Sequence, residues 1–230
     1  ATGQFLAPRG RLLHSAPMFH LADGSGWLAR NVVGGSHVIL PGFTPESVAQ
    51  AIEDHQITDM FLAPTMIQMF VDSPAAARHD LSSLKHLIYG ASPISQAVLE
   101  RAMRLLPQAK LLQAYGMTEL APTTTVLTAD EHLDPALLRS AGRAVPIAEV
   151  KIVDEDDNEV PRGTVGEVAA RGPHVMLGYW NRPEETAQAL RGGWMHTGDG
   201  GYLDDNGYLF IVDRIKDMIV TGGENVYSAE

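Results

Sequence analysis

The chain has 230 residues, of which 45% are hydrophobic and 20% are charged, so it can bury the core of one large or two small domains and is not intrinsically disordered. Its 17 Lys and Arg against 28 Asp and Glu give a formal net charge of -11, which argues against a general nucleic-acid binder because such proteins present a basic face. There is no cysteine, which excludes disulfides, thiolate metal sites and a cysteine nucleophile, and no apolar run approaches the ~20 residues of a membrane-spanning helix.

The first two-thirds of the chain alternate between strand-like and helix-like patterns. In chain order, the pattern predicts a strand at His37–Leu40, a helix at Pro45–Gln56 capped by Thr44, a strand at Thr58–Leu62, a helix at Thr65–Val71, a strand at His86–Tyr89, a helix at Ser95–Leu106 and a strand at Lys110–Gln113. This alternation predicts an α/β fold with a parallel sheet flanked by helices. Such sheets bind ligands at the carboxyl ends of their strands, so we expect a nucleotide near Gly90 and Gly116.

The pattern changes from about Ala141 onward. Strand-like segments at Glu149–Val153, Val165–Arg171 and Tyr208–Val212 are separated by the turn-like runs Asp156–Asn158 and Asp204–Gly207. This part predicts a small antiparallel β subdomain, flat or barrel-like, joined to the first region by Thr128–Arg139.

The segment Tyr115–Glu119 combines an aromatic face, a glycine that permits close approach, a hydroxyl and a carboxylate. Those groups could stack on a base, donate to a phosphate and hold Mg²⁺, which prefers one or two carboxylates together with phosphate oxygens. Taken alone, the segment is more typical of a strand end that runs into a polar turn.

Two further segments invite a functional interpretation. Asp199 lies between glycines and could accept both hydroxyl protons of a vicinal diol such as ribose, although a β-turn is the simpler interpretation. The charged bend Asp213–Asp217, followed by the glycine-rich Gly222–Asn225, is typical of a solvated turn or of a hinge.

These three segments, in this order, resemble the adenylate-forming superfamily of acyl- and aryl-CoA synthetases, luciferases and peptide-synthetase adenylation domains. The resemblance covers essentially the whole chain and is nearest to the fatty-acyl-CoA ligases. Further matching segments are Pro17–His20, Tyr89–Pro93, Gly166–Val168, Gly178–Trp180 and Trp194–Asp199. Asp157 departs from the pattern, because it stands where the family usually has a turn glycine.

The resemblance implies four catalytic roles. Thr118 would contact the α-phosphate, Glu119 would bind Mg²⁺, Lys216 would lie at the hinge of the small C-terminal domain, and His20 would gate the acyl pocket. It also implies a set of residues that bind nucleotide or coenzyme A, with Tyr115 stacked on adenine and Asp199 on the ribose: Gly90, Ala91, Ser92, Tyr115, Gly116, Thr118, Asp199, Arg214, Gly222 and Gly223.

The implied function is the ATP-dependent ligation of a carboxylic acid, expected to be a fatty acid, to coenzyme A through an acyl-adenylate. Its partners would be the acid, ATP or AMP, Mg²⁺ and coenzyme A, with no nucleic acid and no transmembrane segment; a homodimer and a cytoplasmic location are also expected. Two alternatives stay open: an aryl-CoA ligase, and a catalytically incomplete fragment that still binds nucleotide.

The family's phosphate-binding loop and its adenylation lysine do not occur in this sequence, so we expect an internal fragment that is inactive by itself. Residues 1–212 would be the C-terminal part of the large domain, with an α/β part over 1–128 and a β-rich part over 141–212, and residues 213–230 the hinge and the beginning of the small domain. The other notable side chains have plainer interpretations. Histidines are expected at the surface at His14, His79 and His132, methionines in the core at Met66, Met69 and Met103, and tryptophans in packing at Trp27, Trp180 and Trp194.

Overall fold

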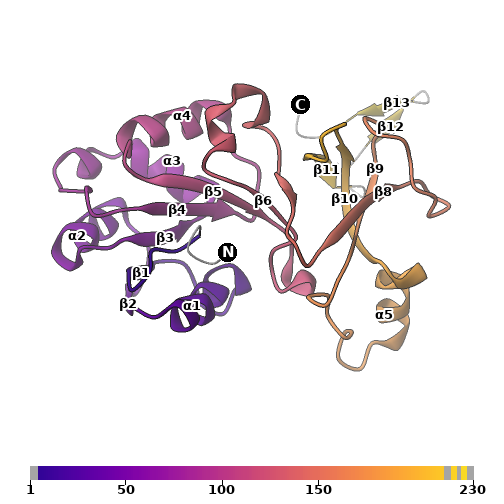
Figure 1. The fold of residues 1–230 in the computed structure, drawn as a ribbon, viewed down its shortest axis with the longest axis horizontal. Coiled ribbons are helices and arrows are strands. Elements are labelled where there is room, and N and C mark those ends of the chain that lie inside the picture. Colours follow the sequence, from indigo (N-terminus) through magenta and orange to yellow (C-terminus); the bar gives the residue numbers. More distant parts are fainter. Residues whose placement is uncertain (1–4, 215–218, 222–223, 227–230) are drawn as a thin grey trace. The chain divides into compact units, whose positions relative to one another are not determined.

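The computed structural model describes residues 5–214, 219–221 and 224–226, which form two compact units (Figure 1). Unit 1 consists of Ala1–Ala114 and Thr128–Arg139, and unit 2 consists of Tyr115–Leu127 and Ser140–Glu230. The predicted joining segment Thr128–Arg139 therefore belongs to unit 1. Whether the large domain ends at residue 212 stays a prediction.

Unit 1 contains a parallel sheet with the strand order β2-β1-β3-β4-β5. The strands are β1 (Arg11–His14), β2 (Ser36–Ile39), β3 (Asp59–Leu62), β4 (His86–Gly90) and β5 (Lys110–Tyr115), and the helices are α1 (Leu21–Val33), α2 (Pro45–His55), α3 (Pro64–Val71) and α4 (Gln96–Leu105). The described part of unit 1 also contains the short 3₁₀ helices η2 (Pro74–Ala77), η4 (Glu131–Leu133) and η5 (Pro135–Leu137), and η6 (Arg191–Gly193) lies in unit 2. The predicted parallel sheet flanked by helices is confirmed, and each predicted strand and helix of this part agrees with the structure to within a few residues.

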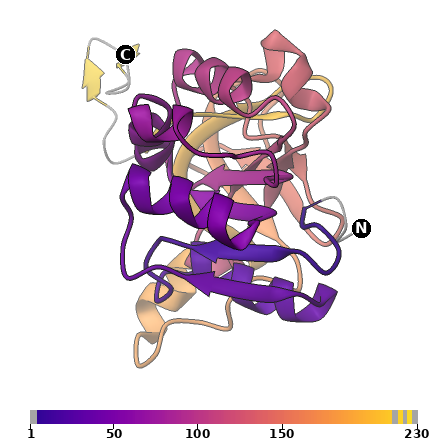
Figure 2. The same ribbon diagram turned by 90° about the vertical axis from the view of Figure 1, so that its left-hand side faces the viewer.

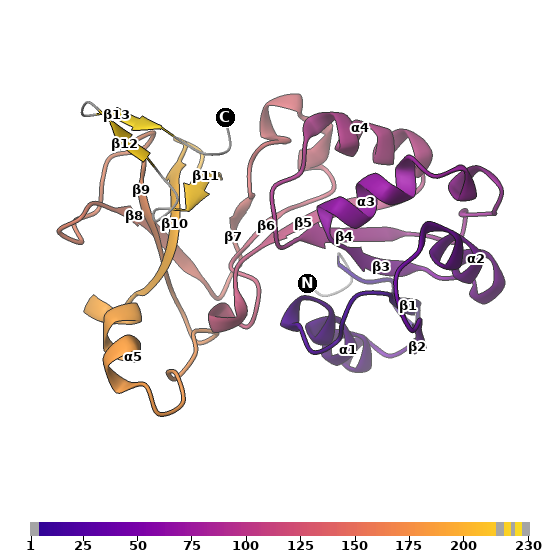
Figure 3. The same ribbon diagram turned by 180° about the vertical axis from the view of Figure 1, so that it is seen from behind.

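The two faces of this sheet are covered differently (Figures 1 and 3). Helices α3 and α4 lie over one face, and together with α2 they bury the main apolar core, whose large side chains include Ile52, Leu62, Ile67, Phe70 and Leu99. Helix α1 lies over the opposite face and contributes nothing to that core. The same layers are visible from the side in Figure 2.

Helix α1 was not predicted, and its sequence explains why. It buries the charged residues Asp23 and Arg30 while Trp27, Leu28 and Val32 are exposed, which is the reverse of the usual amphipathic pattern. A search for apolar side chains at helical spacing therefore finds no buried stripe in this segment.

A fully buried ion pair lies between α1 and the sheet. Arg30 Nη2 is 2.5 Å from Asp59 Oδ2, and both side chains are 0% exposed. The other carboxylate oxygen of Asp59 accepts hydrogen bonds from His86 Nδ1 at 2.7 Å and from the backbone N–H of Ala7 at 2.8 Å. Because a buried charge is costly unless it is paired and hydrogen-bonded, this network sets how α1 docks on its sheet.

Several plainer expectations are wrong. His14 and His132 are buried rather than at the surface, and His79 is half-buried. Met69 is 54% exposed instead of lying in the core, and Trp180 is 90% exposed and packs on nothing in the described part of the chain. Polar partners explain why these histidines lie away from the surface. A pattern in a single sequence does not reveal which polar side chains pair in the interior.

The partners of His132 connect Thr128–Arg139 to the sheet of unit 1. His132 Nδ1 donates to the carbonyl of Thr128 at 2.6 Å, which leaves Nε2 to accept from the Tyr89 hydroxyl at 2.9 Å. Burial lowers the pKa of His132 and raises that of Tyr89, so both are neutral at physiological pH.

Unit 2 contains an antiparallel sheet with the linear order β11-β10-β9-β8. The strands of this sheet are β8 (Glu149–Val153), β9 (Gly166–Arg171), β10 (Met195–Leu203) and β11 (Leu209–Arg214). Unit 2 also contains the helices α5 (Pro183–Ala189) and η3 (Thr118–Leu120). Two further antiparallel strand pairs are β6 (Thr125–Leu127) with β7 (Arg143–Ala144) and β12 (Ile219–Thr221) with β13 (Glu224–Val226). The predicted antiparallel part is confirmed as an open sheet. Across the described ranges, none of the helices has the length and apolar character needed to span a membrane.

We predict that the buried pair of unit 1 contributes strongly to stability. Asp59→Ala in the full-length protein should lower the free energy of unfolding by about 3 to 5 kcal/mol, because it leaves the Arg30 charge buried without a partner. Glu46→Ala, which breaks an exposed pair with Arg78, is the matched control and should change little. Urea denaturation measures both, and equal effects of the two substitutions would contradict this account.

Candidate active site

Strand β10 carries an irregularity at Asp199. In the pairing with β9, His196 lies opposite Ala169 and Gly200 lies opposite Glu167, so the three residues from 197 to 199 face the single residue Val168. Gly198 has a φ of 72°, a conformation that glycine adopts without strain. Bulges of this kind interrupt the ladder and redirect a side chain. The segment that sequence analysis treated as a simple turn is thus the middle of a nine-residue strand.

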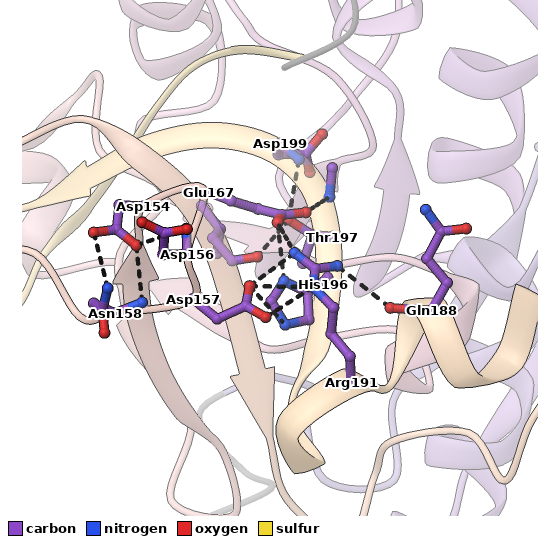
Figure 4. A network of polar contacts seen from close by, with 12 residues as sticks. Asp154, Asp156, Asp157, Asn158, Glu167, Gln188, Arg191, His196, Thr197 and Asp199 are labelled. Carbon is purple, nitrogen blue, oxygen red and sulfur yellow. Dashed lines mark hydrogen bonds and ion pairs between the residues drawn. The ribbon is translucent and has the colours of Figure 1, made fainter.

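Side chains replace the backbone hydrogen bonds that the bulge interrupts (Figure 4). The Thr197 hydroxyl donates to the carbonyl of Val168 at 2.8 Å and accepts from the backbone N–H of Asp199 at 3.1 Å. The backbone N–H of Gly198 donates to Glu167 Oε1 at 3.0 Å. These bonds define the backbone geometry on both sides of Gly198.

The Asp199 carboxylate lies between a hydroxyl and a guanidinium. The Tyr115 hydroxyl donates to Oδ2 at 2.8 Å, and Arg214, its cross-strand partner on β11, approaches Oδ1 with Nε at 3.4 Å. Burial raises the pKa of Asp199, whereas the hydrogen bond from Tyr115 and the charge of Arg214 oppose that rise. Burial and the neighbouring Asp199 charge raise the pKa of Tyr115, so its hydroxyl keeps the proton that it donates.

Glu119 is held by the loop that precedes α5. The Tyr179 hydroxyl donates to Glu119 Oε1 at 2.8 Å, and the backbone N–H of Met176 donates to the Glu119 carbonyl at 2.8 Å. Burial and the contact with Glu119 raise the pKa of Tyr179 to about 12. Thr118, the first residue of η3, is exposed. Glu119 thus presents a carboxylate with one oxygen anchored and further acceptor capacity available.

A second polar network lies beside the bulge (Figure 4). Glu167 Oε2 receives hydrogen bonds from Arg191 Nη2 at 3.0 Å and from His196 Nδ1 at 2.9 Å. Arg191 also donates to Asp157, which has a φ of 64°. The hydrogen bond with Arg191 lowers the pKa of Asp157. Asp157, which stands where the family usually has a turn glycine, therefore keeps the left-handed turn conformation that Asp tolerates. It also adds an ion pair with Arg191.

At the end of β4 in unit 1, the backbone passes very close to the backbone of β5. A Cβ on Gly90 would lie 2.1 Å from the Ala114 carbonyl oxygen on β5, so only glycine fits there. Ala91 has a φ of 70°, which is uncommon for a residue with a side chain, and Ser92 is exposed. In unit 2, Gly116 is equally constrained, since a Cβ there would lie 2.0 Å from the Pro122 carbonyl oxygen.

An apolar groove of about 500 Å³ opens at the ends of β1 and β2 in unit 1. Its lining consists of Ser15, Ala16, Pro17, Met18, Phe19, Ile39, Leu40, Pro41, Gly42, Phe43 and Met66. His20 precedes α1, is exposed and contacts the ring of Phe19 at a centroid distance of 4.5 Å, but it does not line the groove itself.

The structure brings Tyr115, Asp199 and Arg214 together as one cluster, whereas Lys216, Gly222 and Gly223 lie outside the described residues. Sequence reasoning assigned no role to Glu167 or Tyr179. Both occur in segments that match the family pattern, Gly166–Val168 and Gly178–Trp180, and that match was the only signal for them.

Comparisons with known proteins identify the family to which the chain belongs. A family model described as AMP-binding enzyme matches residues 2–180. The chain is 39% identical over 216 residues to the fatty acid–[acyl-carrier-protein] ligase ScoC of Streptomyces coeruleorubidus, covering 93% of this chain and 41% of that protein. It is 40% identical over 227 residues to a feruloyl-CoA synthase of an Amycolatopsis species, covering 98% of this chain and 45% of the relative.

Solved structures include a similar fold. The amide bond synthetase McbA of Marinactinospora thermotolerans superimposes with a TM-score of 0.89 at 39% identity, covering 99% of this chain and 46% of that one. The chain therefore spans less than half the length of these three proteins. The names of these three proteins refer to an acyl-carrier-protein, to coenzyme A and to an amide bond.

We predict that Tyr115→Phe raises the pKa of Asp199 further, because it removes a hydrogen bond that favours the ionised carboxylate. Carbon-13 NMR titration of aspartate carboxyl groups in the full-length protein measures this shift. Tyr202→Phe is the matched control, since Tyr202 stacks on Phe210 and its change leaves the Asp199 contacts intact. An Asp199 titration unchanged by Tyr115→Phe would contradict the assigned contact.

Proposed function

Because this chain belongs to the AMP-binding enzyme family, we propose that the protein that carries it joins a carboxylic acid to coenzyme A in an ATP-dependent reaction that passes through an acyl-adenylate. The observation that carries the proposal is the Asp199 carboxylate, held in a strand bulge between the Tyr115 hydroxyl and Arg214. A rigidly held carboxylate of this kind matches the chemistry of a ribose diol, which offers two hydroxyl donors.

The nucleotide contacts follow from the same cluster. Each oxygen of Asp199 has acceptor capacity beyond its contact with Tyr115 or Arg214, so the carboxylate can accept from the ribose hydroxyls without losing either partner. The ring of Tyr115 would stack on adenine while its hydroxyl keeps the bond to Asp199. In unit 1, the glycine-dependent turn at Gly90, Ala91 and Ser92 is proposed to contact the base.

Glu119 fits a magnesium ion that is bound largely by nucleotide phosphates. No group of three or more His, Asp or Glu side chains that could hold a metal occurs among the described residues. Glu119 is the one carboxylate that we assign to the ion. That donor set suits Mg²⁺, which commonly keeps waters and binds through one or two carboxylates plus phosphate oxygens. The ion would supply positive charge at the phosphates, and the exposed hydroxyl of Thr118 would donate to the α-phosphate.

The proposed chemistry needs no protein nucleophile. A carboxylate oxygen of the acid attacks the α-phosphorus of ATP, and the bond to pyrophosphate breaks. The thiol sulfur then attacks the acyl carbon, loses its proton, and the bond to AMP breaks. Both partners of the first step are anions, so the protein contributes mainly by aligning them and by balancing charge. Lys216 as a hinge and Gly222 and Gly223 as the approach to coenzyme A remain proposals that rest on the family resemblance.

The acyl portion is proposed to occupy the apolar groove of unit 1. Its lining is almost entirely hydrocarbon and aromatic, which favours an apolar acid, and a relative that acts on fatty acids supports a fatty acyl chain. An aromatic acid is the second candidate, because Phe19 and Phe43 line the groove and another relative is a feruloyl-CoA synthase. His20 adjoins the groove through Phe19 and is proposed to gate it.

We predict that Glu119→Gln in the full-length protein lowers the rate of ATP–pyrophosphate exchange by at least about a hundredfold, because a neutral amide is a poor magnesium ligand. Its fold should be intact, since the amide oxygen still accepts from the Tyr179 hydroxyl. Glu184→Gln, at an exposed position in the first turn of α5, is the control with unchanged activity. Near-normal exchange in Glu119→Gln would rule out the metal assignment.

We also predict that Asp199→Ala weakens ATP binding by about 2 kcal/mol, roughly thirtyfold in affinity, because two charge-assisted hydrogen bonds to the ribose are lost. Isothermal titration calorimetry with ATP and, separately, with the carboxylic acid measures the effect. Acid affinity should be unchanged. The opposite outcome, normal ATP affinity with weakened acid binding, would show that Asp199 does not contact the ribose.

A further inference from the structure

We propose that Glu167 is a positioning residue that sets the location of the Asp199 carboxylate and thereby the enzyme's preference for a ribose over a deoxyribose nucleotide. The inference rests on the proposed function, since it takes Asp199 as the ribose contact. It assigns to Glu167 a role that follows from its contacts in unit 2 rather than from any contact with the nucleotide.

Side chains hold the backbone that leads into Asp199. The preceding N–H, that of Gly198, has its partner in Glu167 Oε1 at 3.0 Å rather than in the backbone of β9. Gly198 has a φ of 72° and lies in the bulge, where the regular strand ladder is interrupted. The ladder therefore does not fix the orientation of this part of the backbone. Without the Glu167 acceptor, this N–H would have to find water. The Thr197–Gly198 peptide, one before the peptide that leads into Asp199, would then lose its side-chain anchor, and only the bond from the Asp199 N–H to the Thr197 hydroxyl would hold this backbone.

Glu167 is itself held in place by other side chains. Its other oxygen, Oε2, receives hydrogen bonds from His196 Nδ1 and from Arg191 Nη2, and the His196 side chain is only 4% exposed. Arg191 is bound in turn to Asp157 (Figure 4). A carboxylate with both oxygens engaged has little rotational freedom, so Glu167 acts as a fixed acceptor and not as a mobile surface charge.

The placement of the Asp199 carboxylate bears on the choice between ribose and deoxyribose nucleotides. A site built to hydrogen-bond a hydroxyl discriminates strongly against the analogue that lacks it, because the protein's polar group is then left unpaired. That discrimination depends on placing the acceptor accurately, and displacements of about 1 Å are enough to lose it. Loosening the peptide before Asp199 should therefore reduce the preference for the hydroxyl-bearing sugar more than it reduces the basic ability to bind a nucleotide.

The test compares ATP with 2′-deoxy-ATP and 3′-deoxy-ATP in the full-length protein by measuring kcat/KM for acid-dependent adenylation. Glu167→Ala should reduce the preference for ATP by about tenfold. Glu167→Gln should give an intermediate loss, since its amide oxygen can still accept from the Gly198 N–H but its amide NH2 cannot accept from Arg191 and His196. Glu149→Ala is the matched control. It removes a carboxylate of strand β8 that is paired with Arg171, and it does not reach the bulge.

Each outcome decides the proposal. A folded Glu167→Ala protein with the wild-type preference, or with equal losses for all three nucleotides, would overturn it. If Glu167→Ala does not fold, Glu167→Asp replaces it, since the shorter side chain keeps the charge but draws its oxygens away from Gly198. Asp199→Ala in the same assay separates the two claims: an undiminished preference there refutes the ribose assignment itself, whereas a loss in Asp199→Ala alone refutes only the role of Glu167.

Discussion

The hydrogen bond from the Tyr115 hydroxyl to the Asp199 carboxylate joins two segments that lie 84 residues apart in the chain. Nearly every other feature of the candidate site in unit 2 serves that contact. The bulge in β10 turns Asp199 away from the ladder, Arg214 balances its charge from β11, and Glu167 holds the peptide that precedes it. Burial raises the pKa of Asp199, and the Tyr115 hydroxyl and the Arg214 guanidinium oppose that rise.

The sequence predicted the parts of the fold in which local pattern and burial agree. Helix α2 is an example: Thr44 caps it together with Ser47, Pro45 begins it, and Val48 and Ile52 bury its inner face. The proposed nucleotide contacts rest on a different signal, since the order of their segments along the chain matches a family. Composition or periodicity alone would have left Asp199 in an ordinary turn.

The features that sequence analysis missed share one physical cause, which is that polar groups are satisfied by partners far away in the chain. Helix α1 buries Arg30 against Asp59, 29 residues later, and so inverts the expected amphipathic pattern. His132 is buried because the Tyr89 hydroxyl donates to one ring nitrogen and a local carbonyl accepts from the other. The bulge in β10 likewise depends on Glu167 on β9, and no run of residues around Asp199 reveals that acceptor.

The central claim is that the carboxylic acid attacks the α-phosphorus of ATP. It is tested most directly by supplying the full-length protein with ATP, coenzyme A and an acid labelled with oxygen-18 in its carboxylate, followed by mass spectrometry of the nucleotide product. The account predicts AMP that carries one labelled oxygen on its phosphate, with unlabelled pyrophosphate. Release of ADP with the label in inorganic phosphate would show attack at the γ-phosphorus and would contradict it.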